Sequence, residues 1–206
     1  ADRLTQSADI SLSEYAAQAL EDEGFRGASQ LRSFRFYIND FETVTSGLDV
    51  LANYDFDFTG GQSSLNFAYN YNITEVTHFN PMTLNELRIR QIEDSLPRHR
   101  AHVTWRHQRN SWETSFRANY FGKHWIAHVG SQDFAFEPSA EISFDVVLAY
   151  YFGPQRQYTV VLGAENVFDR YPDENPFGGE TGSKYPEHTP LGILGGQYYL
   201  RLRYEY

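Results

Sequence analysis

The sequence predicts an all-β protein, an antiparallel transmembrane β-barrel segment, from three observations. Segments of about ten residues or more, enough to cross a bilayer when tilted, alternate apolar with polar side chains. Aromatic residues form 17% of the chain, mostly as 15 tyrosines and 16 phenylalanines, which is a β-strand composition. Short and long connections alternate along the chain. A strand with lipid on one face and water on the other favours such a pattern, because its two faces meet different solvents.

The last strand, at 198–206, shows the alternation most clearly. Its apolar positions are Tyr198, Leu200, Leu202, Tyr204 and Tyr206. Its charged positions, between them, are Arg201, Arg203 and Glu205. Six further segments repeat the pattern, at 45–58, 64–75, 98–107, 112–121, 141–152 and 158–168. The opening residues, Arg3 to Leu12, also read as a strand. We therefore expect seven full strands and one at the start.

The connections predict the orientation of these strands in the bacterial outer membrane. The short turns are Thr59–Gln62, Gln108–Ser111 and Gly153–Arg156, and the long loops lie near 13–42, 76–97, 129–139 and 169–194. Outer-membrane barrels have periplasmic turns and longer extracellular loops. Beside the short turns we expect an outward-facing aromatic girdle. Its members are Phe58, Trp112, Phe152, Tyr158 and Tyr206.

One amphipathic helix is predicted in the first long loop, from Leu12 to Glu23. Its apolar residues recur at helical spacing: Leu12, Tyr15, Ala16, Ala19 and Leu20. Ser11 and Glu14 have the spacing of a capping box, and Gly24 is the expected residue after the C-cap. We expect this helix to pack on neighbouring loops.

Several classes of protein are disfavoured. The net charge of −10 and the lack of a basic stripe argue against a nucleic-acid partner. No apolar stretch is long enough for a transmembrane helix, and no cysteine is present. We find no nucleophile elbow, P-loop or H-E-x-x-H motif, so we predict no enzyme, no cofactor and no metal. The first residues do not form a signal peptide, so we expect a processed start or a fragment.

One soluble alternative is an antiparallel β-sandwich, for instance a carbohydrate-binding domain, whose strands would alternate equally well. Soluble strands usually run about five or six residues. A sandwich must also explain polar faces that are rich in Asp, Asn and Arg. The length and the polarity both favour the membrane segment.

Four stretches carry a resemblance to a known family. The stretch Leu162-Gly163-Ala164-Glu165-Asn166-Val167-Phe168-Asp169-Arg170-Tyr171-Pro172 resembles the "gxeNlFDkxY" signature of TonB-dependent outer-membrane receptors. Thr45–Asp49 is similar to the family's "TxGxD" strand start, and Asp2–Leu4 to its "DRI" element. Leu96–Arg100 resembles its "LPrhr" strand start. Together these stretches extend the resemblance over nearly the whole chain.

The resemblance implies a twenty-two-stranded barrel whose lumen holds a plug domain. This chain then corresponds to about the last eight strands, with the plug absent. The implied function is active import of a scarce nutrient, energised through TonB, with an iron-siderophore or similar chelate as cargo. A carbohydrate or cobalamin cargo is an alternative, and so is a small passive barrel acting as a porin or an anchor. Implied partners are outer-membrane lipid, the plug with the remaining strands, TonB and the nutrient. The terminal aromatics Tyr204 and Tyr206 are the implied assembly signal.

The candidate site residues fall into two sets. Polar strand positions are expected to face the lumen and the plug: Asp55, Arg100, Arg106, Arg117, Glu165, Arg201 and Arg203. Loop-end residues are candidates for ligand contact, because imidazole binds metals and the ligand arrives at that end: His78, His124, Trp125, His128 and His188. The alternative for the histidines is that they belong to an aromatic and polar loop wall, or lie at an interface, without ligand contact.

Overall fold

The computed structural model describes residues 3–6, 10–34, 37–81, 84–128, 131–186 and 188–205. The chain divides into two compact units. The smaller unit contains Ala1–Thr45 and Thr74–Ile92, and the larger one contains Ser46–Ile73 and Glu93–Tyr206.

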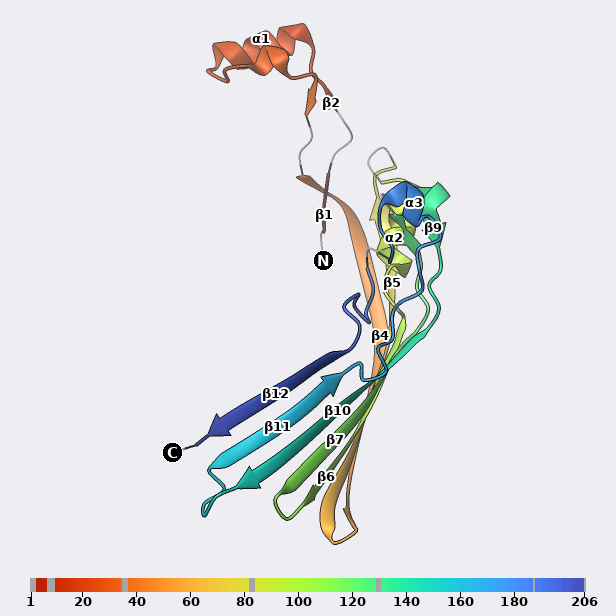
Figure 1. Ribbon diagram of the computed structural model, residues 1–206. Helices are drawn as coiled ribbons and strands as arrows, with labels where there is room; N and C mark the ends of the chain where they lie inside the picture. The colour runs from red at the N-terminus through yellow and green to blue at the C-terminus, as the bar shows by residue number, and fades with distance from the viewer. Residues whose placement is uncertain are drawn as a thin grey trace. The chain divides into compact units, whose positions relative to one another are not determined.

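An eight-stranded sheet contains the long strands that alternation predicts (Figure 1). In spatial order its strands are β1 (Arg3–Gln6), β4 (Tyr37–Phe58), β5 (Gly61–Phe79), β6 (His99–Arg109), β7 (Trp112–Phe121), β10 (Glu141–Phe152), β11 (Tyr158–Glu165) and β12 (Gln197–Tyr204). The pairings from β5 to β12 are antiparallel. Within the described residues the sheet is open, with β1 and β12 as its edges. The expectation of an antiparallel β protein is confirmed.

The boundaries of several predicted strands were wrong. The predicted strand from Arg3 to Leu12 is two short strands, because β2 (Ile10–Ser11) pairs with β3 (Ser33–Phe34) and leaves the main sheet. The hairpin of β4 and β5 extends well past the predicted strand ends at 45 and 75, so both neighbouring loops are shorter than expected. Hydroxyls of Thr45 and Thr74 lie 3.0 Å apart where this extension begins. At the other end of the chain, β11 stops at Glu165, because Asn166 has a positive φ of 49°.

The predicted helix exists as α1 (Glu14–Asp22), but its cap differs from the prediction. Ser13 is the N-cap, and its side chain accepts from the main-chain N of Ala16, so the predicted capping box of Ser11 and Glu14 was wrong. Gly24 follows the C-cap with φ 97°, as expected. A second helix, α2 (Glu86–Asp94), was not predicted. Its start is fixed by Asn85, whose side-chain oxygen accepts from the main-chain N of Arg88.

Short elements organise the remaining loops. A two-stranded sheet pairs β8 (Ile126–Ala127) with β9 (Ala135–Phe136). Single-turn elements in the described part of the chain include η1 (Ala28–Gln30), η3 (Gln132–Phe134) and α3 (Gly178–Thr181).

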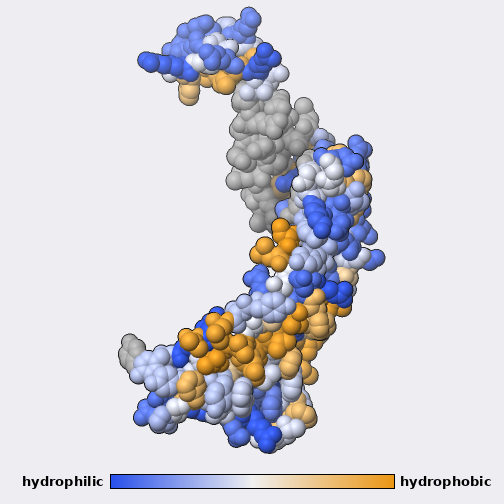
Figure 2. Space-filling view, viewed as in Figure 1, coloured by the Kyte–Doolittle hydropathy of each residue, from blue (hydrophilic) through white to orange (hydrophobic). Residues whose placement is uncertain are grey.

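The strands of the larger unit carry their apolar side chains on one face, and these side chains are exposed. Figure 2 shows such side chains gathered over the strands near the C-terminus. In a soluble sandwich this face would be buried against a second sheet. Exposed members at predicted outward positions include Leu48, Val50, Leu65, Val103, Phe116, Ile142, Phe144, Leu162, Leu200 and Leu202.

The predicted short turns lie at one end of the sheet, together with the C-terminus (Figure 1). Thr59 and Gly60 connect β4 to β5 with positive φ values of 48° and 76°, the type I′ geometry of a two-residue hairpin. Asn110 begins the turn between β6 and β7 with φ 51°. Two-residue turns hold the strands in a fixed register, so that side chains on neighbouring strands line up in rows.

An aromatic row follows this end of the sheet, as the girdle prediction requires. Ring centroids of Trp112 and Tyr150 are 4.5 Å apart, and those of Phe152 and Tyr158 are 5.2 Å apart. Tyr158 in turn stacks on Tyr204 at 5.2 Å. Tyr206, which we expected in the girdle, lies outside the described residues. Tyr204 therefore ends the row that the structure describes.

Candidate functional site

The polar face of the sheet is connected by hydrogen bonds between neighbouring strands. Asn70 donates to Asp49 at 2.7 Å. Further along the sheet, Arg117 donates to the Thr104 hydroxyl at 3.2 Å, and Asn119 donates to Asp145 at 2.9 Å. The alternation of each strand and the antiparallel register bring these polar residues together, so the face is an organised hydrophilic wall.

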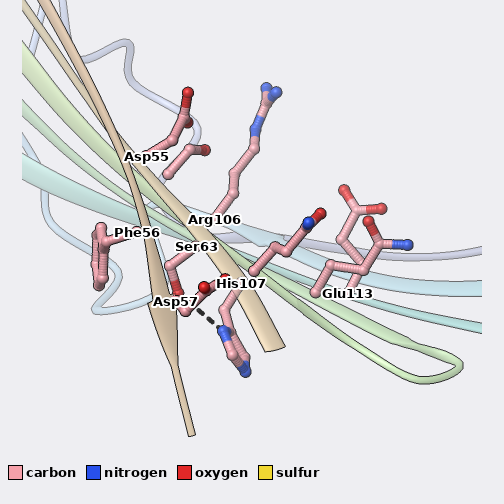
Figure 3. A pocket seen from close by; sticks show the side chains of 10 residues that line it. Asp55, Phe56, Asp57, Ser63, Arg106, His107 and Glu113 are labelled. Atoms are coloured by element: carbon pink, nitrogen blue, oxygen red, sulfur yellow. Dashed lines mark hydrogen bonds between the residues drawn. The ribbon is translucent and has the colours of Figure 1, made fainter. Parts of the chain in front are cut away.

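A hollow of about 540 Å³ lies on this sheet near the short turns (Figure 3). Its charged lining residues are Asp55, Asp57, Arg106 and Glu113. The structure thus brings together Asp55 and Arg106, two of the predicted lumen residues. Glu113, a further polar position of β7, accepts a hydrogen bond from the Tyr151 hydroxyl at 2.7 Å. Its cross-strand partner could be found only from the register of β7 with β10.

The other predicted lumen residues also lie on polar-face positions. Arg100 is on β6 opposite Phe121, Glu165 ends β11 opposite Gln197, and Arg201 is on β12 opposite Val161. The guanidinium of Arg201 lies 5.5 Å from the ring centroid of Tyr199. Arg203 lies 3.7 Å from Glu205, with both side chains exposed. Such an exposed pair contributes little to stability.

Four of the polar-face arginines have no carboxylate partner among the described residues: Arg100, Arg106, Arg117 and Arg201. The side chains of Arg106, Arg117 and Arg201 are exposed on this face, and that of Arg100 is half-buried. A surface of this kind is suited to a polar partner that supplies the opposite charges.

Gly163 on this face is covered by the ring of Tyr199. The two residues are opposite each other in the pairing of β11 and β12. A Cβ on Gly163 would overlap the Tyr199 ring, so only glycine leaves room for this contact. The pair is part of the packing between the last two strands.

Replacing Gly163 with alanine is expected to displace the Tyr199 ring and destabilise the last strand pair by about 1–3 kcal/mol. Urea unfolding of the purified protein measures the change. The double variant Gly163→Ala/Tyr199→Ala is the control, because it removes the overlap and should regain part of the loss. Equal stability of Gly163→Ala and the unchanged protein would contradict this account.

A turn centred on Asn166 joins β10, β11 and the start of β12. The Asn166 side chain donates to the main-chain O of Arg170 at 2.7 Å and accepts from its N at 3.0 Å. The main-chain N of Asn166 donates to Asp145 at 2.9 Å. Asp169 accepts from the main-chain N of Gly196 at 2.7 Å, which fixes the approach to β12. Asn166 and Asp169 therefore have structural roles, and both have positive φ.

Three of the predicted ligand residues are buried. Side chains of His124 and Trp125 are about 5% exposed, and His128 is fully buried. Trp125 donates its main-chain N to Asp94 at 2.9 Å. The ring of His128 is parallel to that of Phe136, with centroids 5.9 Å apart. These residues hold the loops together in the structure.

The remaining two predicted ligand residues lie in different units. His188 belongs to the larger unit, where its main-chain O accepts from Nε2 of His124 at 3.3 Å. His78 belongs to the smaller unit and pairs with Glu42 at 3.2 Å, with both side chains exposed. The structure thus joins His124 to His188 within the larger unit. Among the described residues no group of three His, Asp or Glu side chains could hold a metal ion.

Burial lowers the pKa of His124 below its usual value. Between the ordinary histidine pKa of about 6.5 and this lower value, the unfolded chain binds a proton that the folded loops do not. Stability of the loop cluster is therefore expected to fall as pH drops below about 6.5. Trp125 fluorescence during urea unfolding at several pH values measures this slope. His124→Gln should reduce the slope, and an unchanged slope in that variant would contradict the assignment.

No known family model matches this chain, and no curated protein is significantly similar to it. Among the described residues, none of the helices has the length and apolar character needed to cross a membrane.

Proposed function

We propose that this chain forms part of the barrel wall of a TonB-dependent outer-membrane receptor that imports a scarce nutrient. The observation that carries the proposal is the two-faced sheet, with an exposed apolar side and a hydrogen-bonded polar side. Outer-membrane lipid would cover the apolar side, and a plug with the remaining strands would complete the polar side. The two open edges of the described sheet also support the proposal. A sheet edge in lipid must be paired, so further strands of the receptor would be needed beside both edges.

The Asn166 turn also supports the proposal. It explains why the stretch that resembles the receptor signature has asparagine at 166 and aspartate at 169. Asparagine tolerates a positive φ better than most residues and also bonds to the backbone of its own turn. Asp169 then holds the start of the last strand through Gly196. A motif that anchors the terminal strand pair is expected in a barrel whose closure depends on that pair.

In the proposed mechanism the protein makes and breaks no bond. Loops at the long-loop end capture the cargo, an iron chelate, and TonB transmits energy from the inner-membrane proton gradient. The plug shifts, and the barrel serves as scaffold and polar wall. Arginines without carboxylate partners suit this role, because their charges can be satisfied by the plug in more than one arrangement.

Uptake of a radioactive iron chelate by cells producing the complete receptor tests the function. We expect accumulation that disappears on deletion of the gene and on addition of a protonophore. Cobalamin and oligosaccharides in the same assay test the other cargo classes. Import of none of these cargoes, or entry that does not depend on the proton gradient, would contradict the proposal; the second result would favour a passive barrel.

Charge reversal at Arg201 and Arg203 is expected to weaken plug retention, because both residues lie near the short turns on the polar face. The plug should then be released from the complete receptor at a lower urea concentration. A double reversal at Arg26 and Arg32, which are exposed in the smaller unit, is the matched control. Unchanged plug retention in Arg201→Glu/Arg203→Glu would count against these contacts.

A further inference from the structure

A polar pair lies within the aromatic row on the apolar face. The Ser63 hydroxyl lies 2.8 Å from Nδ1 of His107, and Ser63 is only 4% exposed. The His107 ring stacks on Trp105 with centroids 5.8 Å apart, and Phe58 meets its edge at 5.9 Å. In Figure 3, His107 extends away from Arg106 and Glu113, on the other side of the ribbon. Ser63 thus fixes one ring nitrogen and leaves Nε2 for a second partner.

Arg109 supplies a positive charge beside this pair. Strand alternation places it on the same face as His107, and it is exposed. It has no carboxylate partner among the described residues. A Cβ on Gly61 would lie 2.8 Å from both Cε1 of His107 and Cβ of Arg109, so glycine keeps the space between the strands open. Phe58 and Trp105 beside the pair are uncharged. The carboxylates that line the same hollow as Ser63 and His107 are those of Asp55, Asp57 and Glu113, which strand alternation places on the polar face.

We propose that Ser63, His107 and Arg109 bind the headgroup phosphate of an anionic phospholipid in the periplasmic leaflet. The proposal rests on the proposed function, which places this face in lipid and the short turns at the periplasmic interface. Guanidinium and imidazole N–H groups donate charge-assisted hydrogen bonds to phosphate oxygens. Aromatic rings at this level, such as Phe58 and Trp105, contact the lipid beside its headgroup. A lipid phosphate is therefore the anion that these three side chains would contact at the periplasmic surface of the membrane.

Fluorescence quenching in the complete receptor tests the site. This chain has no cysteine, so Ser111→Cys introduces a labelling position in the adjacent turn for a fluorophore. The receptor is reconstituted in phosphatidylcholine vesicles that contain either nitroxide-labelled phosphatidylglycerol or nitroxide-labelled phosphatidylcholine. We expect stronger quenching by phosphatidylglycerol, and equal quenching by the two lipids after His107→Gln/Arg109→Gln. The control His102→Gln removes an imidazole from the opposite face of β6 and should keep the preference.

The outcomes separate this site from the proposed function. Equal quenching by the two lipids before any change at His107 and Arg109 would overturn the site. A preference that persists in His107→Gln/Arg109→Gln would also overturn it. If neither lipid quenches the fluorophore, the sheet does not face lipid, and the proposed function fails together with the site.

Discussion

Replacing Asn166 with alanine is expected to destabilise the folded protein by about 2–4 kcal/mol. Two hydrogen bonds to the main-chain N and O of Arg170 are lost, each contributing about 1 kcal/mol. Alanine must also adopt φ near 49°, which costs about 1 kcal/mol or more. Urea unfolding of the receptor in detergent, followed by gel mobility without heating, measures the loss.

Two further variants separate these causes. Asn166→Gly permits the positive φ but makes no side-chain hydrogen bond, so it should regain only the backbone part of the loss. Asn53→Ala removes an exposed asparagine from β4 and should change stability by less than about 0.5 kcal/mol. If Asn166→Ala were as stable as Asn53→Ala, the turn would not anchor the last strands.

Replacing Val103 with arginine is expected to cost about 2–4 kcal/mol in a bilayer, the range for a charge on the lipid face near the midplane. Val103 lies midway along β6, opposite Phe67 and Ala118, and is 38% exposed. In a soluble protein, arginine at such an exposed position would change stability by only about 0.5 kcal/mol or less. Denaturant unfolding from lipid vesicles measures the cost.

His102→Arg is the matched control for Val103→Arg. It introduces the same side chain one residue earlier, on the polar face, where His102 is exposed. The control should leave stability nearly unchanged. If the two substitutions changed stability equally, both faces of β6 would be in the same solvent. That result would contradict a lipid-facing side.

The alternation of apolar and polar residues predicted the strands of the sheet well, because this alternation and the length over which it continues are properties of the local sequence. The outward apolar positions, such as Val103 and Leu162, are where the pattern placed them. Boundaries near the loops were less predictable. The predicted first strand is divided between two pairings, of β1 with β4 and of β2 with β3. Alternation within one segment does not indicate which distant segment it will pair with.

The candidate site was harder to predict for the same reason. Position near the long loops suggested that His124, Trp125 and His128 meet a ligand, yet these side chains are buried. Their burial depends on contacts with segments far along the chain, such as the bond from His124 to His188. Cross-strand pairs such as Ser63 with His107 likewise follow from the register.

A nitroxide scan of β6, from position 100 to 106, in the complete receptor in vesicles shows which side chains of this strand meet lipid and which meet water. The chain has no cysteine, so each position can be labelled by a single substitution. Collision rates with oxygen and with a water-soluble nickel chelate distinguish lipid from water. We expect high oxygen access at Ala101, Val103 and Trp105 and low oxygen access at the positions between them. Access to the nickel chelate at Val103 equal to that at His102 would contradict the account.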